Sequence, residues 1–196
     1  PDFFQIPVVG ERDAIWVFTA ANGQYLTGKF DGKAFTPDQK SPLTVEYGAN
    51  SYAVQSFSNL PGGNGRRVQI SWMNGGAYPY MPFNQQMSVP CELTVRRTPE
   101  GLRMFKYPIA ELSGLYGQKS TTTNVQITST EMAPTSLTSD EMDVKATIHL
   151  KNASKISIVI KGQEIRYDVA TGNLSALGRS CHMQPVNGQI TLRILL

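Results

Sequence analysis

Two neighbouring segments decide the fold: EYGANSYAVQSF at residues 46–57 and RRVQISWM at residues 66–73. Both are rich in β-branched and aromatic side chains, which favour strands. The segment between them ends in Asn64 and Gly65, a pair that accepts the positive φ angles of a tight turn. The pattern therefore predicts a β-hairpin with strands at residues 51–57 and 66–73.

The second segment of this hairpin alternates in polarity. Val68, Ile70 and Trp72 fall on one face, which predicts an apolar stripe that points toward a core or a cleft. After Met73 the chain continues as NGGAYPYMPF at residues 74–83, whose glycines and prolines cannot continue a strand. We expect an ordered surface loop that carries aromatic side chains.

Short strand-like runs separated by turn signals continue on both sides of the hairpin. Asn22-Gly23 predicts a tight turn between two of them. Regular spacing of this kind indicates a β-sandwich or the blades of a propeller. The runs are residues 3–7, 14–19, 24–30, 86–97 and 102–107.

A change of pattern near residue 108 marks a domain boundary. Residues 109–116 carry apolar side chains at helical spacing between Pro108 and Gly117, which predicts a short helix. We take residues 108–118 as a linker between a domain at 1–107 and a second β-rich domain at 119–196. The second domain has alternating runs that predict a β-sandwich, so the expected fold class is all-β. These runs are residues 142–150, 154–160, 164–169, 173–177, 181–186 and 189–195.

The composition argues against several functions. The 18 basic and 15 acidic residues are scattered, whereas a nucleic-acid surface needs a clustered basic stripe. No apolar run of roughly 18 residues exists, so no membrane span is predicted. Cys91 and Cys181 fit buried thiols, and the neighbouring Cys181 and His182 lack the number and spacing of a zinc site. We therefore expect no cofactor and no metal.

The order of the motifs resembles glycoside hydrolase family 32, which contains invertases, inulinases and levanases. Each match is short, but together they cover about half of the chain in the family's order. The loop YPYMPF at 78–83 and Pro90-Cys91-Glu92, where the family more often has Pro-Arg-Glu, are most similar to levanase or inulinase members. The matching motifs are Phe30-Asp31-Gly32, Tyr47-Gly48, YAVQSF at 52–57, RRVQISWM at 66–73 and QMSVPCELTV at 86–95.

The resemblance implies a fold and a reaction. Residues 1–107 would be the last blades of a five-bladed propeller, and residues 119–196 a truncated sandwich. Pro1-Asp2 would end the family's Glu-Cys-Pro-Asp acid motif, with Asp2 bracing its loop. The nucleophile motif Trp-x-Asn-Asp-Pro and the Arg-Asp-Pro motif occur nowhere in the 196 residues. We therefore expect an inactive fragment, without catalytic residues, of an enzyme that cleaves β-fructofuranosyl linkages with retention.

Two residues are candidates for substrate binding. A flat indole can cover the apolar face of a sugar, and the resemblance implies that Trp72 lines the fructose pocket, although Ser71 replaces the usual glycine. The alternative for Trp72 is a core position. Glu46 matches a family aspartate that contacts substrate, and its alternative is a solvated glutamate at a strand end. No catalytic residue and no metal ligand is predicted.

The resemblance also implies partners and a location. Fructan or sucrose would be the substrate of the intact enzyme, which would be secreted, periplasmic or on the cell surface. If both ends are cut, open sheet edges would favour self-association. The rival hypothesis is a non-catalytic carbohydrate-binding or scaffolding β-protein.

Overall fold

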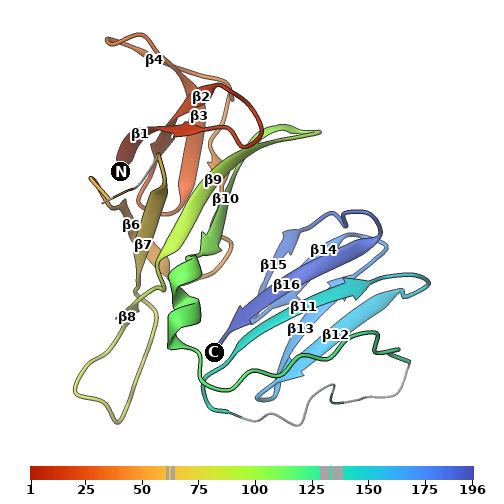
Figure 1. Ribbon diagram of the computed structural model, residues 1–196. Helices are drawn as coiled ribbons and strands as arrows, with labels where there is room; N and C mark the ends of the chain where they lie inside the picture. Colours follow the sequence, from red (N-terminus) through yellow and green to blue (C-terminus); the bar gives the residue numbers. More distant parts are fainter. Residues whose placement is uncertain (61, 63–64, 129–132, 134–138) are drawn as a thin grey trace. The chain divides into compact units, whose positions relative to one another are not determined.

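The computed structural model describes residues 1–60, 62, 65–128, 133 and 139–196 (Figure 1). Strands β1 to β16 dominate these residues, with one short 3₁₀ helix among them, η1 (Ala110–Leu115), which confirms the all-β prediction. The described part of the chain holds no helix with the length and hydrophobicity that a bilayer crossing requires. The chain divides into a first unit, Pro1–Ser113, and a second unit, Gly114–Leu196.

The first sheet of the first unit is antiparallel, in the order β1-β2-β3-β4, with β5 added to β3. The predicted strands at 14–19 and 24–30 form with these bounds. Gly23, with φ of 80°, makes the tight turn between them. The strands are β1 (Asp2–Pro7), β2 (Ala14–Thr19), β3 (Gln24–Phe30), β4 (Phe35–Pro37) and β5 (Leu43–Thr44).

The second sheet has the order β10-β9-β7-β6, with β8 also paired to β7. The predicted hairpin is confirmed as the β6–β7 pair, while Asn64 of its predicted turn lies outside the described residues. The prediction of one strand over 86–97 is wrong. The chain leaves the sheet before Pro90, which has no N–H to donate, and β8 and β9 pair with opposite ends of β7. The strands are β6 (Ser51–Ser56), β7 (Arg67–Met73), β8 (Gln86–Met87), β9 (Cys91–Thr98) and β10 (Gly101–Pro108).

The two sheets of the first unit share one core. Its buried members come from β1, β2, β3, β9 and β10 and include Phe4, Ile6, Val17, Leu93 and Met104. Tyr25 is also buried, and its hydroxyl accepts the N–H of Met104 at 2.9 Å, which ties β3 of the first sheet to β10 of the second.

The face that β7 buries most completely differs from the prediction. Gln69 and Ser71 are each only 1% exposed, whereas the predicted stripe is buried at Val68 and 38% exposed at Trp72. Gln69 pairs with the buried Cys91 of β9, so the polar side of β7 continues the core-facing side of β9. The neighbouring strand, and not the polarity of β7, determines which side is covered.

The second unit contains a two-stranded sheet, β11-β16, and a four-stranded sheet, β12-β13-β14-β15. Leu150, Tyr167, Ile190 and Leu192 form its buried core, and the Tyr167 hydroxyl donates to the Met183 carbonyl at 2.9 Å. The strand predicted at 181–186 instead ends at residue 182. The strands are β11 (Asp143–His149), β12 (Lys155–Ile160), β13 (Gln163–Asp168), β14 (Asn173–Ala176), β15 (Arg179–His182) and β16 (Gln189–Leu195).

Arg66, just before β7, links β9 to the residues after β10. Its Nε donates to Glu92 at 2.9 Å, and its two terminal nitrogens donate to the two carboxylate oxygens of Glu111 at 2.6 and 2.9 Å. These hydrogen bonds from Arg66 lower the pKa of the Glu111 carboxyl to about 2. Glu111 therefore stays ionised to a lower pH in the folded chain than in the unfolded one.

We expect the Arg66–Glu111 pair to make the stability of the first unit depend on acid pH. A carboxyl with a lowered folded pKa stabilises fully above its ordinary value of 4.5, and this contribution disappears as the pH falls toward about 2. Urea unfolding followed by tryptophan fluorescence reports this unit, since Trp16 and Trp72 both lie in it. The free energy of unfolding of wild type should exceed that of Glu111→Gln at about pH 7. This difference should be smaller at about pH 3. A difference that is constant with pH would contradict the assignment.

Candidate functional site

Trp72 lies on an exposed face of the second sheet. Its cross-strand partners are Tyr52 on β6 and Met87 on β8, and directly opposed residues of antiparallel strands share one face. Tyr52, Trp72 and Met87 are 47%, 38% and 54% exposed. These three residues, here called the Trp72 strip, leave the indole accessible rather than enclosed in the core.

Glu46 is a half-buried residue held by an ion pair. Its Oε1 contacts the ammonium of Lys106 on β10, and the two side chains are only 17% and 11% exposed. Gly23 leaves the space that Glu46 occupies, because a Cβ at Gly23 would lie 2.2 Å from the Glu46 Cγ. Glu46 is therefore packed against the β2–β3 turn and is not a freely solvated strand end. No hydrogen bond or ion pair joins it to Trp72 among the described contacts.

Asp2 connects the start of the chain to the second sheet. Its Oδ2 accepts the backbone N–H of Ser56 on β6 at 2.5 Å, and its own N–H donates to the Thr19 hydroxyl at 3.1 Å. Asp2 therefore links β1 to β6 through its carboxylate and to β2 through its backbone N–H.

Several buried polar atoms lie on β6 and β7, and the sequence did not predict their burial. Within the described part of the chain they have no hydrogen-bond partner in the protein, and such atoms cost stability unless they are paired. The alternation along β7 separates a polar side from an apolar side. It does not indicate which of the two sides other strands will bury. The atoms are Ser51 Oγ, Arg67 Nε, Gln69 Oε1 and Ser71 Oγ.

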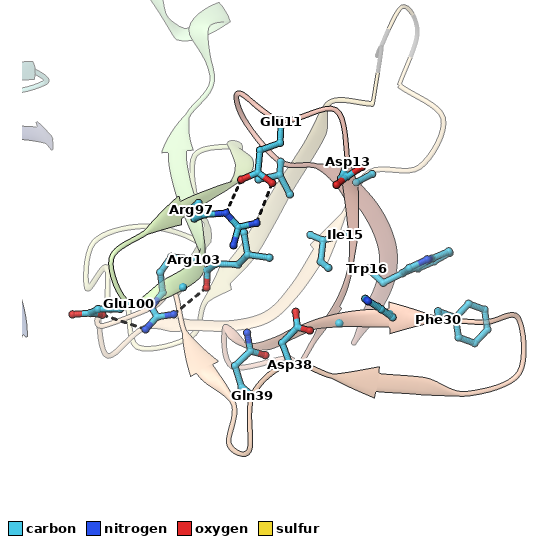
Figure 2. Close-up of a pocket in the computed structure, with 16 residues that line it drawn as sticks. Glu11, Asp13, Ile15, Trp16, Phe30, Asp38, Gln39, Arg97, Glu100 and Arg103 are labelled. Atoms are coloured by element: carbon cyan, nitrogen blue, oxygen red, sulfur yellow. Dashed lines mark hydrogen bonds and ion pairs between the residues drawn. The ribbon is translucent and has the colours of Figure 1, made fainter.

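A separate hollow of about 760 Å³ opens in the first unit and contains neither predicted site residue (Figure 2). Its charges largely pair with one another: Arg97 donates to both carboxylate oxygens of Glu11 at 2.8 and 3.0 Å, and Arg103 donates to Glu100 at 3.2 Å. The hydrogen bond from Arg97 lowers the pKa of the Glu11 carboxyl. Because these groups are already occupied by each other, the hollow is a weaker candidate for ligand binding than the Trp72 strip.

The described side chains offer little for metal chemistry. Within the described ranges, no group of three or more His, Cys, Asp or Glu residues is arranged to hold a metal ion. Cys91 is buried in β9, and Cys181 is half-buried in β15, where burial raises the pKa of its thiol.

Comparisons with known proteins agree on one group of enzymes. Residues 1–108 match the model of the glycosyl hydrolases family 32 N-terminal domain. A levanase of Bacillus sp. strain L7 is 30% identical over 76% of this chain and 18% of its own length. An extracellular exo-inulinase of Meyerozyma guilliermondii is 30% identical over 48% of this chain and 21% of its own.

Among solved structures, the exo-inulinase of Aspergillus awamori matches 99% of this chain and 46% of its own, with a TM-score of 0.74 and 20% identity. At that identity the likeness shows the fold alone. The chain therefore spans about a fifth of the two curated relatives and about half of the solved structure.

Proposed function

Because the chain belongs to glycosyl hydrolase family 32, we propose that it is part of an enzyme that hydrolyses β-fructofuranosyl linkages in fructans or sucrose. The observation that carries this proposal is the family match over residues 1–108, together with relatives named levanase and exo-inulinase. The extracellular relative further supports a secreted, periplasmic or cell-surface location for the whole protein.

The sheet topology supports the architecture that we propose. The two antiparallel sheets of the first unit, which share one core, are the last blades of a five-bladed propeller. The two sheets of the second unit, packed around their own core, form a β-sandwich. The likeness of 99% of the chain to an exo-inulinase structure supports this assignment.

The chemistry divides between this chain and the rest of the whole protein. A retaining glycosidase needs a nucleophilic carboxylate and an acid–base carboxyl about 5–5.5 Å apart. Neither the nucleophile motif nor a complete acid motif occurs in the 196 residues. This chain therefore supplies groups that contact the substrate, while catalytic carboxylates from elsewhere in the whole protein break the glycosidic bond.

Trp72 and Glu46 have different roles in this proposal. The exposed indole of Trp72 covers the apolar face of a fructosyl ring, and its N–H donates to a hydroxyl. Lys106 fixes one oxygen of the Glu46 carboxylate, and the other oxygen accepts a hydrogen bond from a sugar hydroxyl. The ion pair thus positions Glu46 before the substrate arrives.

Replacing Trp72 with alanine in the whole protein should lower kcat/KM for levan or inulin while the fold is kept. The loss of one packed indole face is worth about 1–3 kcal/mol, or roughly 5- to 150-fold. Phe105→Ala is the matched control, because Phe105 is an aromatic of similar exposure, 41%, on β10 of the same sheet. Steady-state kinetics with circular dichroism check the prediction. An unchanged kcat/KM in Trp72→Ala would show that the indole does not bind substrate and has a structural role only.

One observation favours a second function. Because the nucleophile motif is absent from the 196 residues, a carbohydrate-binding or scaffolding protein without activity is the alternative. Hydrolysis of levan by the whole protein excludes this alternative. Binding of levan without hydrolysis would support it.

The isolated chain should self-associate. Phe3, stacked on Trp16 at 4.7 Å, and Phe18 are part of an aromatic cluster on the first sheet, and these two phenylalanines are 38% and 44% exposed. Strands β12 and β15 end the four-stranded sheet, and edge strands present unpaired backbone groups. Sedimentation velocity should show a concentration-dependent dimer or larger species. A compact monomer at all concentrations would contradict this expectation.

A further inference from the structure

The segment that contains Trp72 has an unusual charge distribution. Charged residues make up 17% of the chain, yet no Asp, Glu, Lys, Arg or His occurs between Arg67 and Glu92. This uncharged segment covers most of β7, all of β8 and the loop between them. A surface for an anionic or cationic ligand would carry charges of the opposite sign.

The loop at residues 74–85, here called the aromatic loop, presents large side chains to solvent. Tyr80 is 98% exposed, Met81 53% and Phe83 47%. The loop leaves β7 directly after the Trp72 strip and returns as β8, which carries Met87 of the same strip, and it extends beyond the sheet in Figure 1. Exposed aromatic side chains thus continue from the strip onto the loop.

Internal contacts hold the aromatic loop in shape. The Tyr78 N–H donates to the Asn84 side-chain oxygen at 3.2 Å, and the Tyr78 and Phe83 rings pack with their centres 5.7 Å apart. The Met81 N–H donates to the Tyr78 carbonyl at 3.0 Å, and the Gln85 N–H to the Gly76 carbonyl at 3.2 Å. A loop that is already ordered loses less conformational entropy when it binds a ligand.

These features select one class of ligand. Sugar rings have apolar C–H faces that pack on aromatic rings, and hydroxyls that bond to uncharged amides. Asn74 and Asn84 in the aromatic loop and Gln86 at the start of β8 are exposed amides. A neutral polyhydroxylated ligand can therefore use both parts of the surface without leaving a charge unpaired.

We propose that the Trp72 strip and the aromatic loop bind an extended neutral polysaccharide, with Tyr80 as the outermost platform. That this polysaccharide is a fructan rests on the proposed function. Because the aromatic loop extends beyond the sheet that holds Trp72 (Figure 1), contact with both parts of this surface favours a polymer over sucrose.

Native affinity electrophoresis of the chain in gels that contain levan, inulin or dextran tests the proposal. Wild type should be retarded by levan or inulin, and Tyr80→Ala should bind about tenfold more weakly. Tyr80→Phe keeps the ring and should bind like wild type. Phe105→Ala, which removes an exposed aromatic on β10, is the control and should also bind like wild type.

The outcomes separate this surface from the proposed function. If levan retards wild type and Tyr80→Ala equally, the proposed binding surface is wrong. The proposed function is not affected by that result. Retardation by dextran alone, lost in Tyr80→Ala, would support the surface and contradict the fructan assignment. No retardation in any gel would overturn the surface, while hydrolysis by the whole protein would still test the function separately.

Discussion

Replacing Asp143 with alanine is expected to destabilise the second unit by about 3 kcal/mol, because it leaves a largely buried guanidinium without its carboxylate. Arg193 donates to Asp143 through Nε at 3.0 Å and through a terminal nitrogen at 2.7 Å. The Asp143 and Arg193 side chains are only 12% and 13% exposed. The Tyr116 hydroxyl also donates to Asp143, and hydrogen bonds from Arg193 lower the pKa of this carboxyl.

Hydrogen exchange in peptides of β11 and β16 measures this effect where it arises, since Asp143 begins β11 and Arg193 lies in β16. Asp140→Ala is the matched control, because Asp140 pairs with Lys161 in the same unit but is fully exposed. Asp143→Ala should speed exchange in both strands, and Asp140→Ala should not. Equal protection in the two variants would show that the Asp143–Arg193 pair does not stabilise the second unit.

Replacing Lys106 with methionine should destabilise the first unit by a similar amount, about 3 kcal/mol, since the half-buried Glu46 carboxylate loses its counter-ion. The double variant Glu46→Met/Lys106→Met should recover much of this loss, because an apolar pair can replace a buried ion pair. Urea unfolding followed by tryptophan fluorescence reports this unit. Wild-type stability in Lys106→Met would show that Glu46 is solvated after all and not held by the pair.

Local sequence signals predicted the hairpins of the first unit. Asn22-Gly23 supplies a turn that only two flanking runs of suitable length can use, so β2 and β3 formed with the expected bounds. The pairing of β6 with β7 was predictable because two strand-like runs follow one another in the sequence. These features depend on neighbours in the chain, which a sequence pattern describes directly.

Features that depend on distant segments were not predictable. The polar side of β7 is covered because Gln69 lies beside Cys91 of β9, and no pattern within β7 indicates that neighbour. Glu46 and Lys106 are 60 residues apart, so their ion pair required the fold. For the candidate site, the sequence predicted Trp72 and Glu46 as substrate-binding residues. It could not predict that Trp72 is exposed while Glu46 is packed against Gly23.

Fructose release from levan tests the central claim most directly, measured in parallel for the whole protein and for residues 1–196 alone. If the proposed function is correct, the whole protein should release fructose with retained configuration, since retaining hydrolysis uses two carboxylates. The isolated chain should release none above the buffer rate, since binding groups cannot replace groups that act in the transition state. Fructose release by the isolated chain, or none by the whole protein, would contradict the proposed function.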